Sequence, residues 1–285
     1  MPFPSGLSPV ELPEHATHVG PIGVLADIHG NALALEAVIA DAATIGVQQW
    51  IVLGDVVAMG PNPSEVVERL HHLNPIVSIR GNTDRYVMQG SQPKPSLTEV
   101  MADPSRMSEL VSAAESFAWT RGYLAATDTI GLLDHYVPSA RFTLPDGTRV
   151  LALHASLRSD EGRGISPDVT EPEMAHLIPN PDADLVIGGH THRRADTMFG
   201  RVRYLNPGSV SNSPARGNAA LYSVIHAEPL SHRVEYRTVG YDASSVVAQI
   251  LRSAMPGAVE LVGRYFASDP AYQRVASVSP EPALA

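Results

Sequence analysis

Short apolar segments alternate with longer amphipathic segments through the first third of the chain. Residues 22–26, 50–53 and 76–79 are apolar runs with the length of buried strands. The segment 31–45 and a second segment that begins at Asn62 carry apolar residues at helical spacing. Alternation of strands and helices predicts right-handed crossovers and a largely parallel sheet for this part.

Residues 85–140 interrupt this alternation. They contain several prolines and two predicted helices, near 105–122 and 128–134. We expect an inserted helical cap here, which either packs on the edge of the sheet or controls access of substrate.

The second half of the chain is richer in predicted strands. A Pro-Asp-Gly turn at 145–147 separates two apolar runs and predicts a hairpin. The other expected elements are strands at 185–187, 202–205, 219–225 and 234–239, and a helix near 243–254. We therefore predict an α/β (α+β) fold, with a flexible arm over 1–17, one domain over 18–266 that contains the insert, and a tail over 267–285.

The composition excludes several classes of protein. The chain has no cysteine, which excludes disulfides, thiolate catalysis and cysteine-based metal sites. A net charge of −10 argues against a protein that grips long duplex nucleic acid. No apolar run is long enough to span a membrane and the N-terminus has no secretory signal, so we expect a cytoplasmic protein.

Side chains that can bind metal ions follow five of the apolar segments. Each comes just after a predicted strand, where the ligand sites of α/β sheets gather. They are Asp27, His29, Asp55, Asn82, His154, His190 and His192. Any one of them alone would more often cap a helix or close a turn. Together they are too many for one tetrahedral zinc ion, and they suit two adjacent divalent cations, such as Mn, Fe or Zn, that share a carboxylate.

The order and spacing of these residues resemble the signature of the calcineurin-like metallophosphoesterase superfamily, over residues 22–240. The motifs are Asp27-x-His29, Gly54-Asp55, Gly81-Asn82, His154 and Gly189-His190-x-His192. The resemblance implies a four-layer αββα sandwich of two mixed β-sheets flanked by helices. It also implies that Asp27, His29 and His192 hold one ion, that Asn82, His154 and His190 hold the other, and that Asp55 bridges them.

The resemblance further implies hydrolysis of phosphodiester or phosphoanhydride bonds by a hydroxide that bridges the two ions. We predict catalytic roles for Asn82, Asp84 and His154, and substrate contacts for Asn31, Thr83 and Arg158. Asn31 could instead cap a helix, and Arg158 could instead pair with a surface carboxylate. The motif Asn206-Pro207-Gly208-Ser209 resembles a loop of small bacterial members, or it is a structural turn.

Two departures from the family pattern bear on the substrate. Many relatives carry histidine after Gly-Asn, whereas this chain has Thr83, whose hydroxyl is too weak an acid to protonate a leaving group near pH 7. The segment after Asp55 lacks the Asp-Arg pair of the protein phosphatases. The chain therefore resembles the small bacterial phosphodiesterase-like branch, some of whose members cleave dinucleoside polyphosphates. We expect small phosphorylated metabolites or nucleotides as substrates; the alternatives are a nuclease, a phosphomonoesterase or protein phosphatase, or a non-catalytic scaffold.

Overall fold

The structure is a computed structural model that describes residues 8–13, 16–213 and 219–266. The predicted tail at 267–285 lies outside the described residues, as does more than half of the predicted arm at 1–17. No helix in the described part of the chain is long and apolar enough to cross a membrane.

One sheet has five strands in the order β11-β10-β2-β3-β4. Strands β2, β3 and β4 are parallel, as the strand–helix alternation predicted, whereas β10 runs antiparallel to β2 and β11 runs antiparallel to β10. Their bounds are Gly20–Leu25 (β2), Gln49–Val52 (β3), Val77–Ser78 (β4), Ala219–Ala227 (β10) and His232–Gly240 (β11).

The other sheet has six strands in the order β1-β5-β6-β7-β9-β8. The predicted hairpin is β5–β6, and β6, β7 and β9 are parallel. Strand β1 pairs with β5, so part of the predicted arm is a short edge strand. The bounds are Val10–Glu11 (β1), Ser139–Thr143 (β5), Arg149–Leu153 (β6), Leu185–Ile187 (β7), Ala195–Phe199 (β8) and Val202–Asn206 (β9).

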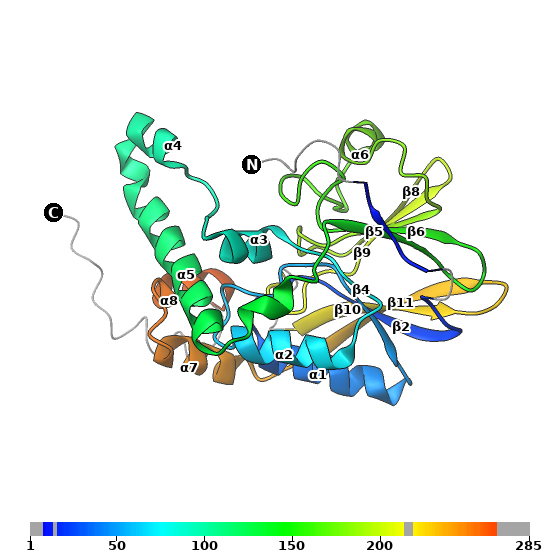
Figure 1. Ribbon diagram of the computed structural model, residues 1–285, viewed down its shortest axis with the longest axis horizontal. Coiled ribbons are helices and arrows are strands. Elements are labelled where there is room, and N and C mark those ends of the chain that lie inside the picture. Colours follow the sequence, from blue (N-terminus) through cyan, green and yellow to red (C-terminus); the bar gives the residue numbers. More distant parts are fainter. Residues whose placement is uncertain (1–7, 14–15, 214–218, 267–285) are drawn as a thin grey trace.

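The two sheets pack face to face and helices cover their outer faces (Figure 1). Successive residues of a strand point to opposite faces, so Val24 enters the core between the sheets while Leu25 packs against the helices. Helices α1 (Ala32–Thr44) and α2 (Pro63–Leu73) cover the five-stranded sheet, and α6 (Glu171–Leu177) covers the six-stranded one. Because both faces of each sheet are covered, inner strands are mainly apolar, and β7 is apolar throughout. The predicted four-layer sandwich of two mixed sheets is confirmed.

The insert is helical, with α3 (Asn82–Gln89), α4 (Leu97–Ala102), a 3₁₀ turn η1 (Pro104–Arg106), α5 (Met107–Ala126) and a second 3₁₀ turn η2 (Ile130–Leu133). The second expected helix is only this short turn, and Asp128, in a left-handed conformation, lies between it and α5. Helix α7 (Ala243–Arg252) was predicted, whereas α8 (Ala258–Tyr265) was not. Both lie beside α5 at one end of the molecule (Figure 1).

Candidate metal centre

Two strand-end loops of the five-stranded sheet are joined by backbone hydrogen bonds. The N–H of Asp27 donates to the Gly54 carbonyl (3.0 Å), and the N–H of His29 donates to the Asp55 carbonyl (2.9 Å). The loop after β2 therefore lies directly against the loop after β3. This contact brings two buried carboxylates, Asp27 and Asp55, to the same edge of the sheet.

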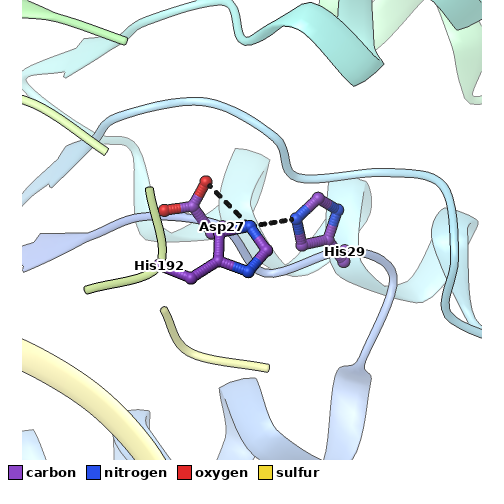
Figure 2. Close-up of side chains that lie close together, drawn as sticks. All are labelled: Asp27, His29 and His192. Atoms are coloured by element: carbon purple, nitrogen blue, oxygen red, sulfur yellow. Dashed lines mark hydrogen bonds and ion pairs between the residues drawn. The ribbon is translucent and has the colours of Figure 1, made fainter. Parts of the chain in front are cut away.

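Asp27, His29 and His192 form a first group of converging donors (Figure 2). The two Nε2 atoms of the histidines are 3.0 Å apart, and Nε2 of His192 is 3.6 Å from Oδ1 of Asp27. The other carboxylate oxygen of Asp27, Oδ2, is buried and has no hydrogen-bond partner among the described residues. Because a buried polar atom without a partner is costly, this oxygen indicates a site for a cation.

Asp55, His154, His190 and Asn82 form a second group. Nε2 of His154 is 3.4 Å from Oδ1 of Asp55. Oδ1 of Asn82 is 3.2 Å from that nitrogen and 3.0 Å from Nδ1 of His190. The opposite orientation of the Asn82 amide would let it donate to both rings, so the oxygen-inward orientation is the one that suits a cation between them.

Asp55 lies between the two groups. Its Oδ1 faces His154, and its Oδ2 is 3.9 Å from Nε2 of His29. The N–H of Thr83 also donates to Oδ1 (2.8 Å) and fixes the carboxylate in place. This is the position that a bridging carboxylate requires.

Backbone carbonyls select which nitrogen of three histidines faces the centre. Nδ1 of His154 is 2.6 Å from the Leu53 carbonyl, and Nδ1 of His192 is 3.1 Å from the Asn212 carbonyl. Nε2 of His190 is 2.9 Å from the Gly162 carbonyl. A carbonyl can only accept, so each of these nitrogens carries the proton. The other nitrogen of each ring then offers its lone pair to the centre, which is how histidine ligands are normally oriented.

The charges of the site favour a bound cation. Burial, reinforced by the neighbouring histidines, lowers the pKa of His29 to about 3 and that of His190 to about 4, so both rings are neutral at pH 7. Burial also raises the pKa of Asp27 to about 6. Burial would lower the pKa of His154, but Asp55 outweighs it and raises this pKa to about 10. Without a metal ion, the site therefore binds a proton on His154. Because this shows that the site favours positive charge, the donor set suits two divalent ions.

Five of the predicted ligands have strained backbone conformations. Their φ angles of 49–69° lie in the left-handed region, and they are Asp27, His29, Asp55, His190 and His192. Each such residue costs about 1–3 kcal/mol unless its surroundings fix it, and such strain gathers at functional sites. Gly81 is needed for a different reason: a Cβ there would lie 2.1 Å from Oδ1 of Asp55.

Asp84, which was predicted to be catalytic, is not among the residues that line the cavity described below. It is fully buried, and its carboxylate accepts four backbone N–H groups, those of Asp55, Val56, Val57 and Gly81, at 2.9–3.2 Å. A carboxylate with both oxygens so occupied is not available to substrate. Asp84 instead holds the loop that carries Asp55 against the start of α3.

The three predicted substrate contacts have different outcomes. Thr83 lines the cavity described below, but its hydroxyl donates to the Val57 carbonyl (3.0 Å). Asn31 is buried and caps α1 by accepting the N–H of Ala34, so the structure supports the alternative of a cap. Arg158 is exposed and does not line the cavity, so the prediction of a substrate contact is not supported.

Arg85 is a buried residue that the sequence analysis missed. Its guanidinium forms a two-point ion pair with Asp160 (2.7 and 2.8 Å) and also bonds Glu161. These two acids lie just before Gly162, whose carbonyl orients His190. In the sequence, the one sign that Arg85 supports the site is its position directly after Asp84.

The Asn206-Pro207-Gly208-Ser209 segment is a structural turn. The Asn206 amide donates to the carbonyls of Ile165 and Gly189, and the Ser209 hydroxyl donates to the Asp27 carbonyl (2.8 Å). Both side chains are fully buried. The turn therefore joins the strand-end loops that carry Asp27 and His190.

A cavity of about 470 Å³ adjoins both groups of donors. His29, Asp55, Asn82, His190 and His192 line it, together with further residues of α3, α5 and α8. The insert thus forms part of the cavity wall through α5. The volume is in the range of sites for small molecules.

Comparison with known proteins adds the family to this geometry. Residues 21–228 match the calcineurin-like phosphoesterase superfamily domain. The chain is 26% identical to an uncharacterized protein of Methanocaldococcus jannaschii (82% of this chain, 93% of that protein) and 25% identical to the phosphodiesterase YfcE of Escherichia coli (79% and 94%). It is also similar to the solved structure of a metallophosphoesterase from Sphaerobacter thermophilus, with a TM-score of 0.63, 25% identity and coverage of 87% of this chain and 98% of the other.

Proposed function

Because the chain belongs to the calcineurin-like phosphoesterase superfamily, we propose that this metal-dependent phosphoesterase uses two divalent cations to hydrolyse phosphodiester or phosphoanhydride bonds of small nucleotide-type substrates. The observation that carries the proposal is the placement of Asp55 between two converging groups of nitrogen and oxygen donors. Mn, Fe and Zn are the cations that suit these donors.

The proposal assigns each ligand a place. Asp27, His29 and His192 hold one cation, Asn82, His154 and His190 hold the other, and Asp55 contacts both. Two such cations supply an activated water as nucleophile and neutralise charge on the phosphate oxygens. The residues of the chain keep these positions rigid: the carbonyls of Leu53, Gly162 and Asn212 hold three of the rings in one orientation.

Thr83 favours substrates with good leaving groups. Its hydroxyl donates its hydrogen to the Val57 carbonyl and not to a group in the cavity. It therefore does not serve as a proton donor, and phosphate or aryl leaving groups, which need little protonation, are affected least. The net charge of −10 and the bounded cavity favour a small substrate over a long nucleic acid.

The test is hydrolysis after removal and return of metal. Protein treated with a chelator, desalted and supplied with Mn²⁺ should hydrolyse bis(p-nitrophenyl) phosphate and a dinucleoside polyphosphate faster than p-nitrophenyl phosphate. Activity should fall at least about a hundredfold in the chelator-treated sample and return with Mn²⁺. Turnover that is insensitive to chelation, or a preference for the monoester, would contradict the proposal.

A further inference from the structure

The cavity has a second wall that the ligands of the proposed centre do not explain. Helix α8 contributes Glu260, Leu261, Arg264 and Tyr265 to it, in the same cavity as residues of the strand-end loops. A substrate whose scissile phosphate reaches Asp55 must therefore also lie beside the last turn of this helix. The polar groups on this wall decide what the rest of that substrate can be.

Tyr265 brings a hydroxyl group close to the loop that follows Asp55. Its Oη lies 3.5 Å from Sδ of Met59, which follows Asp55 by four residues and also lines the cavity. A thioether is a weak acceptor, so the hydroxyl remains available to a stronger one. Burial raises the pKa of Tyr265 and outweighs the opposite effect of the neighbouring Arg264.

Arg264 is an exposed arginine that lines this part of the cavity. Its guanidinium carbon lies 6.0 Å from the ring centre of Tyr265, with whose hydroxyl it interacts, and no ion pair with a carboxylate is found for it within the described residues. The lysine of the cavity, Lys94, is paired with Glu99 (3.4 Å). A guanidinium suits phosphate because it offers parallel N–H donors.

Because these two side chains line the same cavity as Asp55, we infer that Arg264 and Tyr265 bind a second phosphate group of the substrate, next to the one that is cleaved. This inference rests on the proposed function and narrows it to organic phosphoanhydrides, in which two or more phosphates are linked. The cavity wall beside them includes the rings of Tyr86 and Phe117, which suit the flat organic part of such a substrate.

The test compares two substrates in the full-length protein with Mn²⁺. We define the selectivity ratio as kcat/KM for diadenosine tetraphosphate divided by kcat/KM for bis(p-nitrophenyl) phosphate, which has only one phosphate. Arg264→Gln should lower this ratio about 10- to 100-fold, mainly through KM, because a charged hydrogen bond to the second phosphate is lost. Tyr265→Phe should lower it in the same direction by about threefold to tenfold.

The matched control is Arg252→Gln, which removes an exposed arginine of α7 that does not line the cavity and should leave the ratio unchanged. A wild-type protein that hydrolyses both substrates, with the same ratio in Arg264→Gln and Tyr265→Phe, would overturn the inference but leave the proposed function intact. A wild-type protein that hydrolyses neither substrate would overturn both.

Discussion

Replacement of Asp55 by asparagine is expected to lower kcat/KM for bis(p-nitrophenyl) phosphate by about a thousandfold, which corresponds to about 4 kcal/mol of activation free energy. Asparagine has the same shape but carries no charge and offers only one oxygen. The variant therefore cannot hold both cations from one side chain, whereas the contact with the Thr83 N–H survives. Steady-state kinetics with Mn²⁺, together with the metal content of the purified variant, measure the effect.

The melting temperature of Asp55→Asn shows whether its activity is lost through a change of function or through unfolding. Without a cation, Asp55 is the charged partner of His154, so in chelator the Asp55→Asn protein should remain folded but melt at a lower temperature than wild type. Added Mn²⁺ should raise the free energy of unfolding of the wild type more than that of the variant. At a hundredfold excess of metal over Kd, the rise for the wild type is about 2.7 kcal/mol for each site. Asp134→Asn, which alters an exposed aspartate, is the control and should retain both activity and metal. Full turnover in Asp55→Asn would show that Asp55 does not bridge the cations.

Asp84→Ala is expected to destabilise the protein by about 3 kcal/mol or more. The substitution leaves four backbone N–H groups without their acceptor in a buried place, and each unsatisfied group costs about 1–3 kcal/mol, offset in part where water enters. The loop of residues 55–57 then loses its attachment to α3. Thermal or urea unfolding in chelator measures the loss without a contribution from bound metal.

The control for Asp84 is a carboxylate with a purely local role. Asp242 is exposed and caps α7 by accepting the N–H of Ser245. Asp242→Ala should therefore lower the free energy of unfolding by only about 1 kcal/mol. If Asp84 instead acted directly on substrate, Asp84→Ala would abolish turnover while its unfolding curve stayed close to that of wild type. That outcome would return Asp84 to the catalytic role first predicted for it.

The candidate ligands could be predicted from the sequence because each one follows an apolar strand directly. Strand ends are local features, and parallel strands bring their ends to one edge, so Asp27 and Asp55 had to lie near each other once the alternation was recognised. The four-layer arrangement followed from the same residues through the family that they resemble. Neither step required knowledge of contacts between distant side chains.

The supporting residues could not be predicted in this way because their roles depend on distant contacts. Asp84 was predicted to be catalytic from its place in the family motif, yet its oxygens bind N–H groups of residues 27 to 29 positions earlier as well as that of Gly81. Arg85 pairs with Asp160, 75 positions away, although Arg158 is much closer to Asp160 in sequence. Helix α8 is short and follows a Pro-Gly step, which conceals its apolar spacing.

The metal content of the untreated protein tests the central claim most directly. The protein is expressed and purified without chelator, and its metals are measured by inductively coupled plasma mass spectrometry. It should contain close to two transition-metal ions per chain. Asp55→Asn prepared in parallel should contain fewer. A well-folded wild-type protein that carries no transition metal and does not bind added Mn²⁺ would contradict the account.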